Sequence, residues 1–168
     1  MRTGQNVRIV GLKLDLRIVG IDPGVKTGFA EWIIPSTGQG VLRHVDTLRI
    51  DQAMARIICS PVPALVVFED ARKRKFFNAE RDARQRLKPG VREGVGSVKR
   101  DCGIWEDFLR AQNIPFVAQP PKVGMTKRTH EQFERMTGWS GRTSEHARDA
   151  AMLVWGLTTS HIQRFVAR

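Results

Sequence analysis

The sequence predicts a single mixed α/β domain in which helices cover a β-sheet. Three observations predict it: apolar runs rich in Ile and Val that end in turn residues, stretches of helical period between them, and an order of three strands followed by alternating helices and strands, without internal repeats. The 168 residues, 41% of them hydrophobic, suffice for one core. We expect residues 1–15 to be a poorly specified leader and residues 16–168 to form the domain.

The expected strands are short and apolar. They lie at residues 16–21, 29–34, 41–50, 64–68 and 114–118. Between the second and the third, Pro35, Gly38 and Gly40 are typical of a hairpin loop.

The expected helices follow the third strand. They lie at residues 52–59, 91–112, 129–136 and 144–165. Asp51 is the expected N-cap of the first of them, and Pro61 ends it. The longest has an apolar stripe at spacings of three and four, formed by Val98, Cys102, Trp105, Phe108 and Leu109.

The composition excludes several classes of protein. No apolar run approaches the roughly 18 residues of a membrane span, so we expect no membrane partner. The two cysteines, Cys59 and Cys102, lack the spacing of a zinc site, and we expect both to be buried thiols in a reducing compartment. The expected location is therefore cytoplasmic, and no small-molecule cofactor is indicated.

The net charge of +11 favours a nucleic-acid partner. Much of it is local, because residues 71–90 contain eight basic residues and only two acidic ones. The alternative is a solvated, charged segment without a partner. Phe76 and Phe77 lie within the basic segment, where an aromatic ring can stack on an unpaired base; alternatively, one of them anchors the loop to the core.

Acidic residues close two of the apolar runs. Asp22 follows the first run and precedes a Pro23-Gly24 turn, whereas Glu69 and Asp70 follow the run at 64–68. A carboxylate at the end of a buried strand is costly unless a cation lies beside it. In a basic chain, these acids indicate a metal site that acts on a polyanion.

A third acidic motif lies on the last expected helix. His146 and Asp149 are three residues apart and therefore share a face. Small residues beside them, Ala147, Ala150 and Ala151, allow that helix to approach a sheet closely.

The three motifs together resemble the RuvC family of Holliday-junction resolvases, in the RNase H-like superfamily. The resemblance lies in residues 18–24, 67–69 and 146–150 and covers roughly residues 16–154. It implies a five-stranded sheet of order 3-2-1-4-5, with strand 2 antiparallel, flanked by helices.

The resemblance also implies a metal site and a chemistry. The ligands would be Asp22, Glu69, His146 and Asp149, which would hold two Mg²⁺ ions, or Mn²⁺, per active site. Many members of the family have Asp where this chain has His146, and some have His. The expected reaction is phosphodiester hydrolysis in branched DNA, most of all in four-way junctions, with 5′-phosphate and 3′-hydroxyl products made by a homodimer.

The expected DNA contacts come from the basic segment and from lysines after the fifth strand. They are Arg72, Lys73, Arg74, Lys75, Phe76, Phe77, Lys122 and Lys127, with one of the two phenylalanines as a wedge. The main alternative is a non-catalytic nucleic-acid-binding module on the same scaffold. At single positions, Asp22 could simply form the turn, Asp70 or Glu69 could pair with Arg72, and Asp149 could pair with Arg142 or Arg148.

Overall fold

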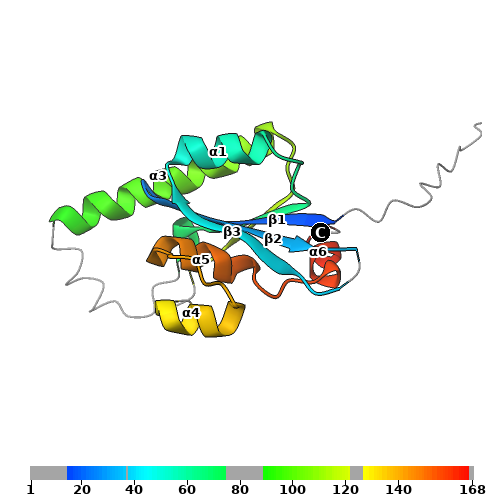
Figure 1. Ribbon diagram of the computed structural model, residues 1–168. Helices are drawn as coiled ribbons and strands as arrows, with labels where there is room; N and C mark the ends of the chain where they lie inside the picture. Colours follow the sequence, from blue (N-terminus) through cyan, green and yellow to red (C-terminus); the bar gives the residue numbers. More distant parts are fainter. Residues whose placement is uncertain (1–14, 37, 75–88, 122–126, 167–168) are drawn as a thin grey trace, which may run out of the picture.

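A five-stranded mixed sheet forms the centre of the protein (Figure 1). The structure, a computed structural model, describes residues 15–36, 38–74, 89–121 and 127–166. The strands are β1 (Leu16–Asp22), β2 (Thr27–Ile34), β3 (Val41–Leu48), β4 (Leu65–Glu69) and β5 (Phe116–Gln119). The helices are α1 (Ile50–Ile58), the short 3₁₀ helix η1 (Ala71–Lys73), α3 (Pro89–Ala111), α4 (His130–Thr137), α5 (Glu145–Val154) and α6 (Thr159–Val166).

The strand order is β3-β2-β1-β4-β5, as the resemblance implies. β2 runs antiparallel to β1 and β3, whereas β4 runs parallel to both of its neighbours, β1 and β5. β1 and β4 are buried on both faces, which explains why their sequences are continuous apolar runs rather than alternating ones.

Helices cover both faces of the sheet and make two cores. Figure 1 shows α1 and α3 on one face and α4 and α5 on the other. Val19, Ile21 and Phe68 point towards α1 and α3, where they pack with Trp105 and Leu109.

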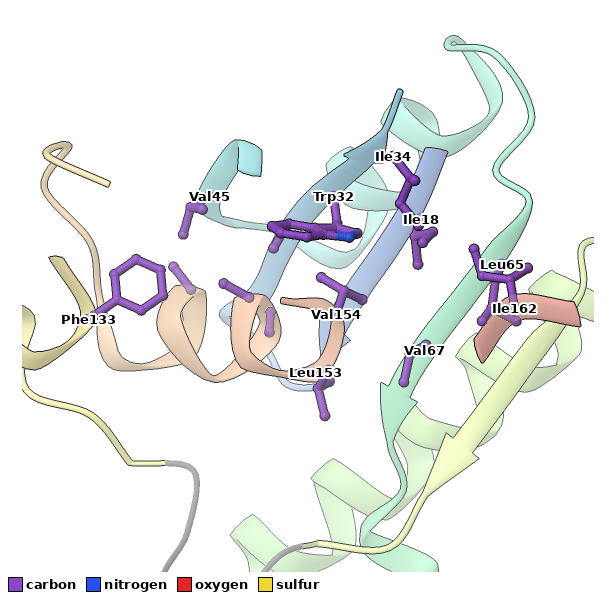
Figure 2. Packing of buried hydrophobic residues seen from close by; sticks show 14 residues of the cluster. Ile18, Trp32, Ile34, Val45, Leu65, Val67, Phe133, Leu153, Val154 and Ile162 are labelled. Carbon is purple, nitrogen blue, oxygen red and sulfur yellow. The ribbon is translucent and has the colours of Figure 1, made fainter. Parts of the chain in front are cut away.

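The second core lies under α5. Ile18, Leu65 and Val67 point to this face and pack with Val154 and Trp32 (Figure 2). Side chains alternate between the two faces of a strand. The last residues of β1 and β4, Asp22 and Glu69, are therefore expected on the α5 face.

Two glycines allow the backbone of α5 to lie directly on the sheet. A Cβ atom at Gly20 of β1 would overlap the carbonyl oxygen of Ala150, and one at Gly28 of β2 would overlap that of His146. The small residues of α5 and these glycines therefore fix the height of the helix above β1 and β2.

Several expected boundaries are wrong. The third strand ends at Leu48, and α1 begins at Ile50 with Arg49 rather than Asp51 at its N-cap; the Gln52 side chain accepts a hydrogen bond of 3.0 Å from the Arg49 N–H. The helix expected over 144–165 is two helices, because Gly156 has a left-handed φ of +79° between α5 and α6.

The two cysteines differ in environment. Cys102 is buried in the core between α3 and the sheet, whereas Cys59 is exposed at the end of α1, so the expectation that both are buried is wrong for Cys59. Within the described ranges, no helix has both the length and the apolarity that a bilayer span requires.

The seating of α5 gives a test of the fold. We expect Gly20→Ala to lower the free energy of unfolding by about 1–3 kcal/mol, because the added methyl group must push α5 away from β1. The matched control is Gly96→Ala in α3, where no neighbour lies within 4 Å of the added atom. Alanine should raise stability there by about 0.5–1 kcal/mol through helix propensity. Urea unfolding measures both, and equal stabilities of Gly20→Ala and the wild type would contradict the close contact.

Candidate functional site

Asp22 and Glu69 lie side by side at the carboxyl ends of two parallel strands. The register pairs Ile21 with Phe68, so the next residues on the two strands, Asp22 and Glu69, are neighbours. Ile21 and Phe68 point towards α1 and α3. By alternation, the two carboxylates therefore point to the opposite face, under the first turn of α5.

His146 comes to Asp22 from that first turn. A hydrogen bond of 2.8 Å joins His146 Nδ1 to Asp22 Oδ2. Two features place the imidazole there: the backbone of His146 rests on Gly28, and the Ser144 side chain caps α5 by accepting a hydrogen bond of 3.1 Å from the Ala147 N–H. The expected proximity of Asp22 and His146 is thus present.

Asp149 follows one turn later on α5, and one oxygen of its carboxylate lacks a hydrogen-bond partner among the described residues. Its Oδ1 atom is buried and accepts no hydrogen bond from any residue that the structure describes. Arg148, one of the alternative partners, instead donates hydrogen bonds of 2.8 Å to the Arg128 carbonyl oxygen and 2.9 Å to that of Thr143.

The electrostatics of the site oppose ionisation of both acids. Burial, followed by the charges of Asp22 and Glu145, raises the pKa of Asp149 to about 6. Burial also raises the pKa of Asp22, although the hydrogen bond from His146 partly offsets it. The carboxylates of β1 and α5 therefore lie close enough to repel each other, and a cation between them would remove that repulsion.

The donor atoms of these residues fit a hard divalent cation. Carboxylate oxygens with one imidazole are the donors that Mg²⁺ and Mn²⁺ take, and a buried carboxylate oxygen without a hydrogen bond is a vacant donor. No group of three or more His, Cys, Asp or Glu side chains is gathered as a ready cluster among the described residues. The four-residue ligand set of Asp22, Glu69, His146 and Asp149 therefore stays a prediction.

Asp70 has a structural role on the other face. It is 1% exposed and accepts hydrogen bonds of 3.0 Å from the Arg72 backbone N–H and of 2.8 and 2.9 Å from the Arg72 guanidinium. Burial acts to raise the pKa of Asp70, but the hydrogen bonds from Arg72 outweigh it, so that the pKa lies below its usual value. Asp70 is thus held by Arg72 and is not part of the acidic site.

Arg72 is therefore engaged within the protein. Its guanidinium also pairs with Glu106 of α3, so one cation compensates two acids and ties η1 to that helix. The expectation that Arg72 contacts DNA stays a prediction, since the residue pairs with two carboxylates of this chain but its side chain remains 35% exposed.

The remaining expected DNA contacts fall into two groups. Lys73 donates a hydrogen bond of 2.9 Å to the Ala118 carbonyl oxygen, and Arg74 is exposed. Lys127 forms an ion pair with Glu145, a residue that the sequence analysis did not single out, although its spacing of four from Asp149 signals a shared helix face. The others, namely Lys75, Phe76, Phe77 and Lys122, lie outside the described residues.

The contrast between Arg72 and Arg74 can be tested. We expect Arg72→Ala to lower stability by on the order of 3 kcal/mol, because it leaves the Asp70 carboxylate buried without its partner. Adding Asp70→Asn to the Arg72→Ala variant should restore part of the lost stability. The matched control, Arg74→Ala, should change stability by less than about 0.5 kcal/mol. Unfolding in urea distinguishes the roles, and equal effects of the two alanine variants would contradict the structural assignment of Arg72.

The raised pKa of Asp149 predicts how stability depends on pH without divalent ions. Because its pKa of about 6 lies above the value of 3.8 for an unperturbed group, the stabilising contribution is present below pH 4 and is lost as pH rises through 6. The Asp149→Asn variant has no carboxylate at this position, so its stability does not fall in this way as pH rises. The difference in Tm, variant minus wild type, should therefore grow between pH 4 and pH 7 by on the order of 2–4 °C. Asp51→Asn, at an exposed acid of α1, is the control. A difference that does not change with pH would contradict the assignment.

Comparisons with known proteins support the fold. No family model matches the chain, and no curated protein matches it. Among solved structures, the chain is similar to RuvC of T. thermophilus in complex with a Holliday junction substrate, with a TM-score of 0.55 and 16% sequence identity over 91% of this chain and 96% of that chain. At this identity the likeness shows the architecture: a five-stranded mixed sheet with flanking helices, of the RNase H-like type found in RuvC.

Proposed function

We propose that the protein is a divalent-metal-dependent endonuclease that nicks branched DNA, with four-way Holliday junctions as its main substrate. The observation that carries the proposal is the buried carboxylate oxygen of Asp149, which lies beside Asp22 and accepts no hydrogen bond within the described part of the chain. It lies at the carboxyl ends of parallel strands, where open α/β sheets place ligands. The RuvC-like fold and the net charge of +11 support DNA as the ligand.

The chain's own residues would bind the metal and orient the site. Asp22 and Asp149 would supply carboxylate oxygens, and Glu69 would add another from the neighbouring strand. His146, whose Nδ1 lies 2.8 Å from Asp22 Oδ2, would add an imidazole nitrogen once a metal takes the place of that hydrogen bond. Bound Mg²⁺ or Mn²⁺ would activate a water for in-line attack and stabilise the departing 3′ oxygen, which leaves 5′-phosphate and 3′-hydroxyl ends.

Basic residues near the site would hold the phosphate backbone. Lys26 is exposed in the turn that follows Asp22, and Lys73 and Arg74 follow β4. Together with residues 75–88 of the basic segment, they would provide the salt-dependent part of DNA affinity. Resolution of a four-way junction requires two symmetric cuts, so we infer that the active form is a homodimer.

A non-catalytic nucleic-acid-binding module is the alternative. Such a protein would gain nothing from a half-buried carboxylate whose pKa is raised to about 6, because the ionised acid lowers the stability of the fold at neutral pH. In the nuclease proposal, that carboxylate has a role as a metal ligand.

Asp22→Asn tests the proposal. It should slow cleavage of a labelled four-way junction by about a thousandfold or more, because it removes a charge that the reacting centre needs. Junction binding without metal should persist, since phosphate contacts dominate affinity. The control Asp51→Asn should cut normally. Four-way, flap and linear duplexes are compared with Mg²⁺ and with Mn²⁺.

Two results would contradict the proposal. One is cleavage by Asp22→Asn at the wild-type rate. The other is the absence of nicking of every branched substrate by folded wild-type protein with both metals.

A further inference from the structure

Lys127 is held beside the acidic site by Glu145. Its ammonium group pairs with the Glu145 carboxylate, which belongs to the first turn of α5. The lysine lies two residues before Thr129, the N-cap of α4, whose side chain accepts a hydrogen bond of 3.2 Å from the Gln132 N–H. The backbone that carries Lys127 is thus anchored to a capped helix, and its long side chain can reach more than one acceptor.

Glu145 and Asp149 make one acidic face on α5. They are four residues apart, a spacing at which two carboxylates are neighbours on the helix and repel each other. His146 brings Asp22 to the same end of the helix. Lys127 is therefore a cation that pairs with one of three carboxylates, two of them on α5 and the third at the end of β1.

The electrostatics agree with this geometry. The hydrogen bond to Glu145 raises the pKa of Lys127, and the charges of Asp149 and Asp22 add to the effect. In turn, the charge of Lys127 acts to lower the pKa of both Asp22 and Asp149. The ammonium group thus already supplies part of the positive charge that the site needs.

The ion pair between Lys127 and Glu145 is exposed and can therefore break easily. The side chains of Lys127 and Glu145 are 76% and 51% exposed, and an ion pair as exposed as this contributes little net stability. A divalent ion among the carboxylates would meet the ammonium group at close range and repel it.

We propose that Lys127, docked on Glu145, is the resident counter-ion of the Asp22–Asp149 site, and that a divalent ion binds there in competition with its ammonium group. The proposal rests on the proposed function, since it assigns a regulator to the same metal site. Glu145 acts as a positioning residue, because it holds the lysine at the edge of the site and away from Asp22 and Asp149.

The test measures Mn²⁺ binding to the 168-residue chain without DNA, by calorimetry and by the electron paramagnetic resonance of free Mn²⁺. Lys127→Gln should tighten Mn²⁺ binding by on the order of tenfold. Lys99→Gln removes an equal charge from an exposed position on α3, across the sheet, and should change Kd by less than about twofold.

Glu145 is tested by a double-mutant cycle. Glu145→Gln should weaken Mn²⁺ binding, because the released lysine then lies on Asp22 and Asp149. Lys127→Gln should therefore tighten binding more in the Glu145→Gln background than in the wild type. Equal effects in the two backgrounds would overturn the docking role of Glu145.

The remaining outcomes separate this proposal from the proposed function. If Asp149→Asn abolishes Mn²⁺ binding while Lys127→Gln matches Lys99→Gln, the metal site stands and the counter-ion proposal is overturned. If folded wild-type protein binds no Mn²⁺, both proposals fail. Thermal melting confirms that each variant is folded, and Lys127→Gln decides the question if Glu145→Gln does not fold.

Discussion

The direct contact between the backbone of α5 and the glycines of two strands determines the geometry of the site. Gly20 and Gly28 leave no side chain between the helix and the sheet, so the carbonyl oxygens of Ala150 and His146 lie where Cβ atoms would otherwise be. The helix brings two of the candidate ligands, and the sheet brings the other two. The distance between the pairs is therefore set by main-chain atoms, which tolerate little adjustment.

On the two faces of the sheet, Asp70 and Asp149 differ in the partners of their carboxylates. On the α3 face, Asp70 is neutralised locally by Arg72, two residues along the chain, and the network extends to Glu106. On the α5 face, the Oδ1 atom of Asp149 has no hydrogen-bond partner among the described residues, and the exposed Lys127 pairs with Glu145 instead. The same lack of a partner among the described residues holds for the buried Oδ2 atom of Asp101 on α3, so the feature particular to Asp149 is its position beside Asp22, which agrees with the proposed metal site.

Much of this arrangement could be predicted from the sequence because it depends on local pattern. The apolar runs before Asp22 and Glu69 identify buried strands, and the acids after them mark the carboxyl ends. The spacing of His146 and Asp149 requires only a helix. These signals, with the resemblance, suffice for the strand order that the structure confirms.

The wrong helix boundaries and the unexpected ion pairs arise where contacts between distant residues, or local signals of similar strength, determine the structure. The apolar spacing of α5 continues through Leu157 and Ile162, but Gly156 turns the chain, and the Trp32 indole donates a hydrogen bond of 2.9 Å to the Leu157 carbonyl oxygen. The Arg72–Glu106 and Lys127–Glu145 pairs join residues 34 and 18 positions apart, and no local pattern indicates such partners. Asp51 is the residue that cap preference indicates, but α1 begins one residue earlier, and the Gln52 side chain accepts a hydrogen bond of 3.0 Å from the N–H of the N-cap, Arg49.

The glycine contacts have a consequence for any search for inactive clones. Random mutagenesis scored by the proposed cleavage activity would recover substitutions at positions 20 and 28 among the impaired alleles, although glycine offers no group to the chemistry. Such alleles would be misread as catalytic unless protein abundance were followed in parallel. In this protein, a residue can be indispensable because of the atoms it lacks.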